Sequence, residues 1–252
     1  MKPLLKLLTE NRGRGQFRAE TGADEATVYL YDTIVSDAET AAWWGGVDPL
    51  TFAKTLAGID APVIHLRINS PGGDVFAAQA MAQTLREHPA KVIAHIDGYA
   101  ASAATEVAVS ADEVIMAPGA MYMIHNAWTI AIGNKSDFLD TAALLEKVDG
   151  TLAQAYADRT GGDIKQIVDW MDAETWFTAQ EAVDAGFADS IAEAKTKAQA
   201  SATWNLSAYK HAPAPQQIEE PAPEPEPEPA APAAKYDTDH LKRRLALIAA
   251  SA

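Results

Sequence analysis

A serine and a histidine lie in this sequence at positions where both could take part in nucleophilic catalysis. Ser102 stands in the stretch 98–105, whose small residues would leave its hydroxyl accessible on a tight turn. His125 follows the apolar stretch 121–124, where a polar loop begins. A histidine there could act as a general base because its ordinary pKa lies near neutrality. Each residue alone also has an ordinary interpretation, as a helix cap for Ser102 and as a core histidine for His125.

A turn rich in glycine could supply main-chain donors to the same chemistry. Residues 69–74 read Asn-Ser-Pro-Gly-Gly-Asp and lie between an expected strand and an expected helix. Glycines let the backbone approach a ligand closely, and N–H groups at the start of a helix can hold a developing oxyanion. The ordinary interpretation is a plain strand-to-helix turn, because Gly and Pro occur in most turns and loops.

Two acidic residues could orient the imidazole. Asp172 and Glu174 lie in a polar loop between two expected helices. Acidic residues in loops are mostly solvated, so this signal is weak when taken alone. Both residues remain candidates for the third member of a triad.

The elements that would position these residues alternate along the chain. Apolar stretches predict strands and amphipathic or Ala-rich stretches predict helices. Asp48-Pro49 is typical of a helix start, Gly161-Gly162 of a helix end, and residues 178–181 of a capping box. The alternation favours an α/β layered domain with a largely parallel sheet. The expected strands are 28–31, 63–68, 92–96, 114–116 and 121–124, and the expected helices are 49–57, 74–87, 101–110 and 136–159.

Composition excludes several classes of function. The 252 residues hold 35 acidic and 20 basic side chains, a net charge of −15, and no cysteine. A disulfide scaffold, a thiolate zinc site and a cysteine nucleophile are therefore excluded, and general nucleic-acid binding is disfavoured. No stretch approaches the roughly 18 apolar residues of a membrane span. We expect a cytoplasmic protein with no membrane partner.

The proline content marks the end of the folded part. Eight of the 14 prolines lie between Pro213 and Pro232, where Pro and Glu alternate. Such a stretch repels itself and buries nothing, which predicts an extended linker. We therefore expect four parts: an N-terminal segment 1–24, a folded domain 25–195, a linker 196–236, and a short basic helix within 237–252.

Taken together, these motifs resemble the Clp protease proteolytic subunit (ClpP) family, over about residues 27–192. Each motif alone is a weak signal, but their order along the chain is specific for the family. The matching positions are 68–73, 98–102, 123–125, 177–182, Gly186 and Asp189. It implies a serine peptidase with a ClpP/crotonase-like layered fold, a long handle helix and no metal or other cofactor.

The resemblance also implies residue roles. Ser102 matches the nucleophile and His125 the base, while Gly73 and Ala103 match the positions whose N–H groups form the oxyanion hole. Glu174 stands where the family carries an aspartate, with Asp172 as the fallback acid. The sequence departs from the family again at 126–128, where Asn-Ala-Trp replaces the usual Gln-Pro, which affects the expected substrate contacts.

The extension beyond residue 195 resembles the phage-encoded branch, the ClpP-related head maturation proteases. That branch implies cleavage of scaffold or capsid proteins, in the host cytoplasm or inside a prohead, with the helix in 237–252 binding a head protein. The family further implies a homo-oligomer of seven-subunit rings stacked in pairs. The alternatives are a housekeeping subunit that works with an unfoldase ATPase and a ring or scaffold protein with a degenerate triad.

Two rival enzyme classes share the fold but fit the residues less well. A signal-peptide-peptidase-A-like enzyme needs a serine–lysine pair, and no lysine of the central domain stands in a motif. An acyl-CoA enzyme of the crotonase superfamily needs no serine–histidine pair, and it would need a basic nucleotide site that the sequence does not show.

Overall fold

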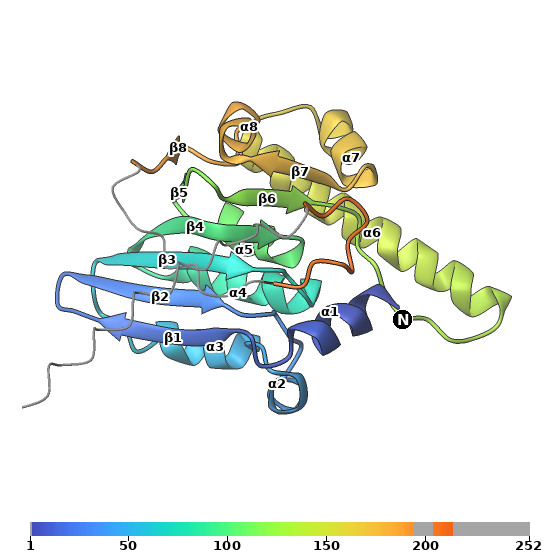
Figure 1. The fold of residues 1–252 in the computed structure, drawn as a ribbon, viewed down its shortest axis with the longest axis horizontal. Coiled ribbons are helices and arrows are strands. Elements are labelled where there is room, and N and C mark those ends of the chain that lie inside the picture. The colour runs from blue at the N-terminus through green and yellow to red at the C-terminus, as the bar shows by residue number, and fades with distance from the viewer. Residues whose placement is uncertain (1, 194–203, 214–252) are drawn as a thin grey trace, which may run out of the picture. The chain divides into compact units, whose positions relative to one another are not determined.

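The computed structural model describes residues 2–193 and 204–213 (Figure 1). Most of the predicted linker and the whole of the predicted helix 237–252 lie outside these residues. Within them, no helix is both long and apolar enough to cross a membrane. The same residues contain no group of three or more His, Asp or Glu side chains that could hold a metal ion.

The strands of the described residues form one mixed, mostly parallel sheet in the order β1-β2-β3-β4-β5-β8. Strands β6 and β7 branch from it, because β6 pairs with the end of β4 and β7 pairs with β6. Only the pairs β1–β2 and β6–β7 are antiparallel. The bounds are β1 Gln16–Thr21, β2 Glu25–Tyr31, β3 Val63–Ser70, β4 Lys91–Ala101, β5 Glu113–Met116, β6 Met121–Ile124, β7 Thr175–Thr178 and β8 Ser190–Ile191.

Several helices begin or end where local chemistry predicts. Asp48 caps α3 by accepting from the N–H groups of Leu50 and Thr51, and Gly161 ends α6 in the left-handed conformation. The predicted capping box of Thr178 and Glu181 opens α8. The bounds are α1 Pro3–Asn11, α2 Ala38–Trp44, α3 Pro49–Leu56, α4 Val75–Glu87, α5 Ala103–Val109, α6 Lys135–Thr160, α7 Ile164–Asp172 and α8 Ala179–Asp184.

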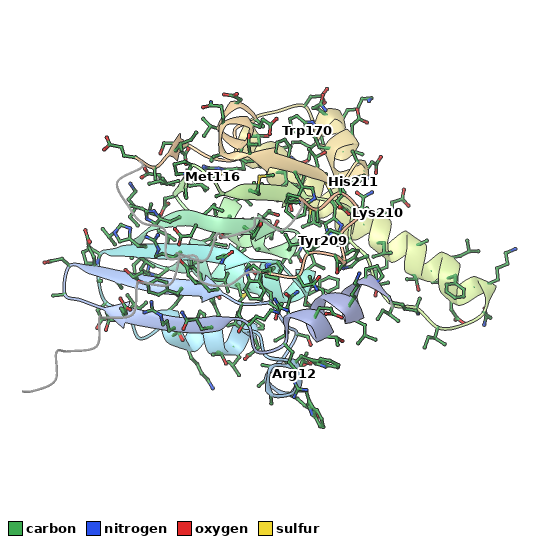
Figure 2. All side chains as sticks on the ribbon, in the orientation of Figure 1. Arg12, Met116, Trp170, Tyr209, Lys210 and His211 are labelled. Carbon is green, nitrogen blue, oxygen red and sulfur yellow. The ribbon has the colours of Figure 1, made fainter. Side chains whose placement is uncertain are left out.

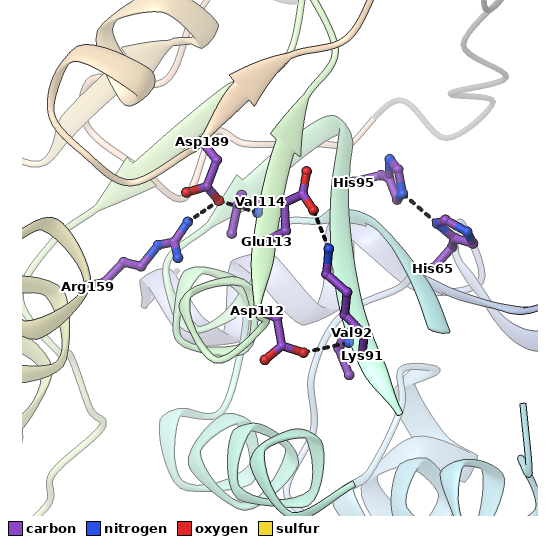
Figure 3. A network of polar contacts seen from close by, with 9 residues as sticks. All are labelled: His65, Lys91, Val92, His95, Asp112, Glu113, Val114, Arg159 and Asp189. Atoms are coloured by element: carbon purple, nitrogen blue, oxygen red, sulfur yellow. Dashed lines mark hydrogen bonds and ion pairs between the residues drawn. The ribbon is translucent and has the colours of Figure 1, made fainter. Parts of the chain in front are cut away.

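Strand β3 shows how the sheet separates an apolar face from a polar one. Ile64, Leu66 and Ile68 are fully buried in the core that α3, α4 and α5 share with the strands, as alternation along a strand requires. The residues between them are only partly buried. One of these, His65, is hydrogen-bonded through Nδ1 to Nε2 of His95, at 2.9 Å (Figure 3).

Carboxylates hold neighbouring strands together at the end of the sheet where β4 and β5 begin (Figure 3). Asp112 accepts from the N–H of Val92 at 2.7 Å, and Asp189 accepts from the N–H of Val114 at the same distance. Arg159 of α6 also donates to Asp189. These contacts fix β4, β5 and the start of β8 at the end of the sheet where β4 and β5 begin.

The chain on both sides of the predicted domain also folds onto it. The N-terminal segment contributes α1 and β1, and Leu7 of α1 is buried. Residues 204–213, within the predicted linker, place Trp204, Leu206 and Tyr209 in the same small core as Leu7. Asn11 and Asn205 join the two segments, because the Asn205 N–H donates to Asn11 Oδ1 at 2.7 Å and Asn11 Nδ2 donates back to the Asn205 carbonyl.

Helix α6 is buried along only part of its length. Its second half contributes Val148, Leu152 and Tyr156 to the main core. Its first half leaves Phe138 and Leu139 exposed. Most residues of this half are exposed, and the helix extends past the body of the domain (Figure 1).

Candidate active site

Ser102 lies on the sharp turn between β4 and α5. Its backbone has φ 55° and ψ −128°, and although it occupies the N-cap position of α5, its side chain makes no capping bond to the helix. A residue with a side chain adopts such a positive φ only at a cost of about 1–3 kcal/mol. Among the described residues, the non-glycine residues with positive φ are Ser102 and Glu174. The turn holds the serine hydroxyl clear of the helix, as in a nucleophile elbow.

The Gly72-Gly73 turn lies directly against the Ser102 turn. A Cβ built on Gly72 would come within 2.4 Å of the Ala101 carbonyl oxygen and 3.0 Å of the Ala103 nitrogen. The turn is fixed from its other side, since the N–H of Ile34 donates to the Gly72 carbonyl and the N–H of Asp74 donates to the Ile34 carbonyl, both at 2.9 Å. The structure therefore brings together two turns that are about 30 residues apart in the sequence.

The two predicted oxyanion donors are positioned beside this junction. No hydrogen bond within the described residues uses the N–H of Gly73 or of Ala103. Both residues line the same cavity as Ser102 and His125. Free N–H groups next to a serine hydroxyl have the composition of an oxyanion hole.

His125 directly follows β6, and its imidazole lies against the serine. Its Nε2 lies 2.7 Å from the Oγ of Ser102, the distance of a nucleophile–base hydrogen bond. Burial lowers the pKa of His125 to about 4, and the charge of Glu174 works in the opposite direction. The imidazole is therefore neutral at neutral pH and able to accept a proton. The ring is packed edge-on against Trp128, with centroids 4.8 Å apart.

The two candidate acids have different surroundings. Glu174 is 9 % exposed and acts on His125 through its charge, whereas Asp172 is exposed and accepts from Asn126 Nδ2 at 2.6 Å. No hydrogen bond among the described residues joins Glu174 to His125. Instead the Glu174 carboxylate accepts from the backbone N–H groups of Lys210, at 3.0 Å, and His211, at 2.6 Å.

A cavity of about 420 Å³ opens beside Ser102 and His125. One side is formed by α6, through Leu144, Leu145 and Val148, and another by residues 127–132. These side chains form its apolar part, while Ser102, His125, the glycine turn, Asp74, Thr129 and Thr141 contribute polar groups. The cavity can hold an apolar side chain next to the Ser102 hydroxyl.

Sequence reasoning missed the aromatic residues around the imidazole. Tyr209 packs edge-on against His125, with centroids 5.4 Å apart, and it stacks on Trp128 at 5.1 Å. Figure 2 shows Tyr209, Lys210 and His211 on one short segment beyond the ends of the strands. The available signal was the run Trp-Asn-Leu-Ser-Ala-Tyr at 204–209, whose apolar residues are out of place in a linker.

Comparisons with known proteins agree with this arrangement. The Clp protease family model matches residues 50–195. The ATP-dependent Clp protease proteolytic subunit of Streptococcus agalactiae is 36 % identical over 134 residues, which cover 52 % of this chain and 68 % of that subunit. Proteolytic subunit 2 of Tropheryma whipplei is 33 % identical over 130 residues, covering 51 % and 72 %.

The solved structures show the same fold. A point mutant of ClpP1 from Listeria monocytogenes superposes with a TM-score of 0.56 and 24 % identity, covering 67 % of this chain and 92 % of that one. The predicted mixed α/β architecture with a long helix is confirmed. The chain belongs to the Clp protease family and is a serine endopeptidase of that family.

Proposed function

We propose that Ser102, His125 and Glu174 form the catalytic triad of this peptidase. The observation that carries the proposal is the 2.7 Å contact between Ser102 Oγ and His125 Nε2 at the mouth of the cavity. The serine lies on a strained turn and the imidazole is neutral, so the pair has both the geometry and the protonation state that proton transfer requires.

The chemistry is acyl transfer to the serine. His125 accepts the Ser102 proton as Oγ bonds to the peptide carbonyl carbon, and the N–H groups of Gly73 and Ala103 bind the resulting oxyanion. His125 then gives this proton to the leaving amine as the C–N bond breaks. Water repeats the cycle on the acyl-enzyme and frees Ser102. Each oxyanion donor of this kind contributes about 3 kcal/mol to the transition state.

A fluorophosphonate probe tests the proposed role of Ser102. The probe should attach to Ser102 Oγ in the full chain, with mass spectrometry locating the adduct, and heat-unfolded protein should not react. A degenerate triad would leave the folded protein unlabelled. Labelling of any other serine would contradict the assignment.

Glu174 is the proposed acid, and a pair of isosteric amides tests this choice. We expect Glu174→Gln to lower kcat by roughly 10- to 1,000-fold, because the buried charge that stabilises the imidazolium is lost. The loss is smaller than the roughly 10⁴-fold known for a hydrogen-bonded triad acid, since Glu174 acts here without that bond. Asp172→Asn is the matched control and should retain at least half of the activity, and a larger loss at Asp172 would reverse the assignment.

We also propose that the physiological substrates are scaffold or capsid proteins of a phage prohead. The support is the chain beyond residue 213, which lies outside the range matched by the family model and carries the Pro–Glu repeat. A tethered segment of this kind raises the effective concentration of the enzyme at its target.

Deleting residues 214–252 tests the prohead proposal without disturbing the described fold. We expect the shortened chain to keep its peptidase activity on small substrates and to be missing from proheads. Equal amounts of both forms inside proheads, measured by mass spectrometry, would contradict the proposed targeting role.

A housekeeping subunit remains the second candidate, because the relatives are named ATP-dependent. In that case, a Clp unfoldase with ATP would stimulate degradation of a folded substrate by the full chain. The head maturation role predicts no such stimulation.

We propose assembly into seven-subunit rings stacked in pairs. The exposed apolar residues of the first half of α6 and of the loop before it support this, because they need a partner surface. Ile132 is 91 % exposed and Leu139 is 60 % exposed. Sedimentation of the full chain measures the size of the assembly.

A further inference from the structure

Residues 204–213 are held firmly against the loop that carries the glycine turn. The indole N–H of Trp204 donates to the carbonyl of Asn69 at 3.0 Å, and the phenol of Tyr209 donates to the carbonyl of Pro71. Trp204 and Tyr209 are buried. The segment therefore fixes two carbonyls in the three residues before Gly72-Gly73.

Tyr209 also limits the movement of the imidazole. His125 meets the edge-on rings of Tyr209 and Trp128, and these two rings are stacked with an interplanar angle of 7°. The ring of Trp176 also packs against the ring of Tyr209, with centroids 5.9 Å apart. A ring held in this way cannot leave its rotamer without breaking the aromatic stack, so His125 stays aimed at Ser102.

The next two residues act on the acid. The N–H groups of Lys210 and His211 each donate to one oxygen of the Glu174 carboxylate. These two bonds fix the carboxylate beside the imidazole. One short segment thus contacts the glycine turn, the base and the acid.

The segment supports the site without filling it. None of its residues lines the cavity that opens at Ser102, so a substrate can approach the serine while Tyr209 is in place. The segment also lies outside residues 50–195, the range matched by the family model.

On the basis of the proposed triad, we propose that residues 204–213 are an integral part of the catalytic centre. Tyr209 is the positioning residue that orients His125 and the Pro71–Gly73 turn. The backbone N–H groups of Lys210 and His211 hold Glu174.

The test replaces Tyr209 in the full chain and follows hydrolysis of acetyl-leucine p-nitrophenyl ester. Tyr209→Leu should lower kcat by about 10- to 100-fold with KM nearly unchanged, because a small misplacement of the base costs this much. Tyr209→Phe keeps the ring and loses the bond to Pro71 and the interaction of the hydroxyl with Ser102, so we expect a loss of about 3- to 10-fold, within the usual worth of neutral hydrogen bonds. Tyr99→Leu is the matched control, since Tyr99 packs on the same Trp176 but has no ring contact with His125, and it should leave kcat unchanged.

The pH profile separates positioning from a loss of general stability. Glu174 is the charged group acting on the imidazole, with Ser102 and Tyr209 as its other polar neighbours. Removing Tyr209 opens His125 to water, so its lowered pKa should rise towards the ordinary value of about 6.5. Because the base must be neutral, the acidic limb of kcat/KM should move to higher pH in Tyr209→Leu and stay in place in Tyr99→Leu.

Four results would overturn the proposal. A higher kcat in Tyr209→Leu would make the segment an inhibitor, and equal losses in Tyr209→Leu and Tyr99→Leu would make it a structural support only. If Tyr209→Leu does not fold, Tyr209→Phe replaces it in the test. A wild-type kcat together with an unmoved pH profile in Tyr209→Phe would then overturn the proposal. If the wild-type chain hydrolyses no ester, the proposed triad is refuted instead. NMR titration of His125 in the wild type and in Tyr209→Leu would then test the positioning role directly. An unshifted His125 pKa in Tyr209→Leu would reject that role.

Discussion

Replacing Ser102 by alanine should abolish peptide cleavage while leaving the fold intact. The change removes the atom that attacks the carbonyl, and loss of a triad serine lowers kcat by roughly 10⁶-fold. The fold should survive because the serine side chain caps no helix and its described hydrogen bond goes to His125. Cleavage of a fluorogenic peptide and the melting temperature measure the two effects.

A second serine near the same helix provides the control. Ser110 follows α5, and its hydroxyl bonds to the Val107 carbonyl at 2.7 Å. Ser110→Ala should keep the wild-type rate. Peptide cleavage by Ser102→Ala at a rate close to that of the wild type would refute the triad, wherever the remaining activity came from.

Replacing Gly73 by alanine should also have a large effect, by moving an oxyanion donor. Gly73 has φ 150°, and a Cβ there would lie 1.9 Å from the carbonyl oxygen of Ile34. The turn must therefore shift, and the loss of one donor lowers kcat by about 10²–10³-fold. We also expect a lower melting temperature, since the bridge to Ile34 breaks.

Gly119→Ala is the matched control for this prediction. A Cβ at Gly119 meets no heavy atom within 4 Å, so activity and melting temperature should both stay unchanged. If Gly73→Ala kept the wild-type kcat, the N–H of Gly73 would have no part in stabilising the oxyanion.

The sequence predicted those parts of the fold that local chemistry determines. The caps at Asp48, Gly161 and Thr178 lie where expected, because each needs only residues within one turn of the helix. The pairing of Ser102 with His125 came from the order of family motifs, and the distance between their side chains agrees with it. The positive φ of Ser102 could not be predicted from residue types, because it depends on the geometry of the turn between β4 and α5.

Contacts between distant parts of the chain escaped prediction for a physical reason. Trp204 bonds to Asn69, 135 residues earlier, and Tyr209 bonds to Pro71, 138 residues earlier. Periodicity is a local property and says nothing about such pairs. The N-terminal helix α1 shows the same difficulty, since Leu7 is buried by residues near the other end of the described chain.

The exchange of hydrogen bonds between Asn11 and Asn205 has a consequence for synthesis on the ribosome. Helix α1 emerges first, whereas its partner residues emerge only after some 190 more amino acids have been added. Until then Leu7 and the carbonyl of Asn69 lack the neighbours that cover them in the finished molecule. A nascent chain therefore cannot complete the surroundings of its own imidazole until residues 204–213 have left the ribosome.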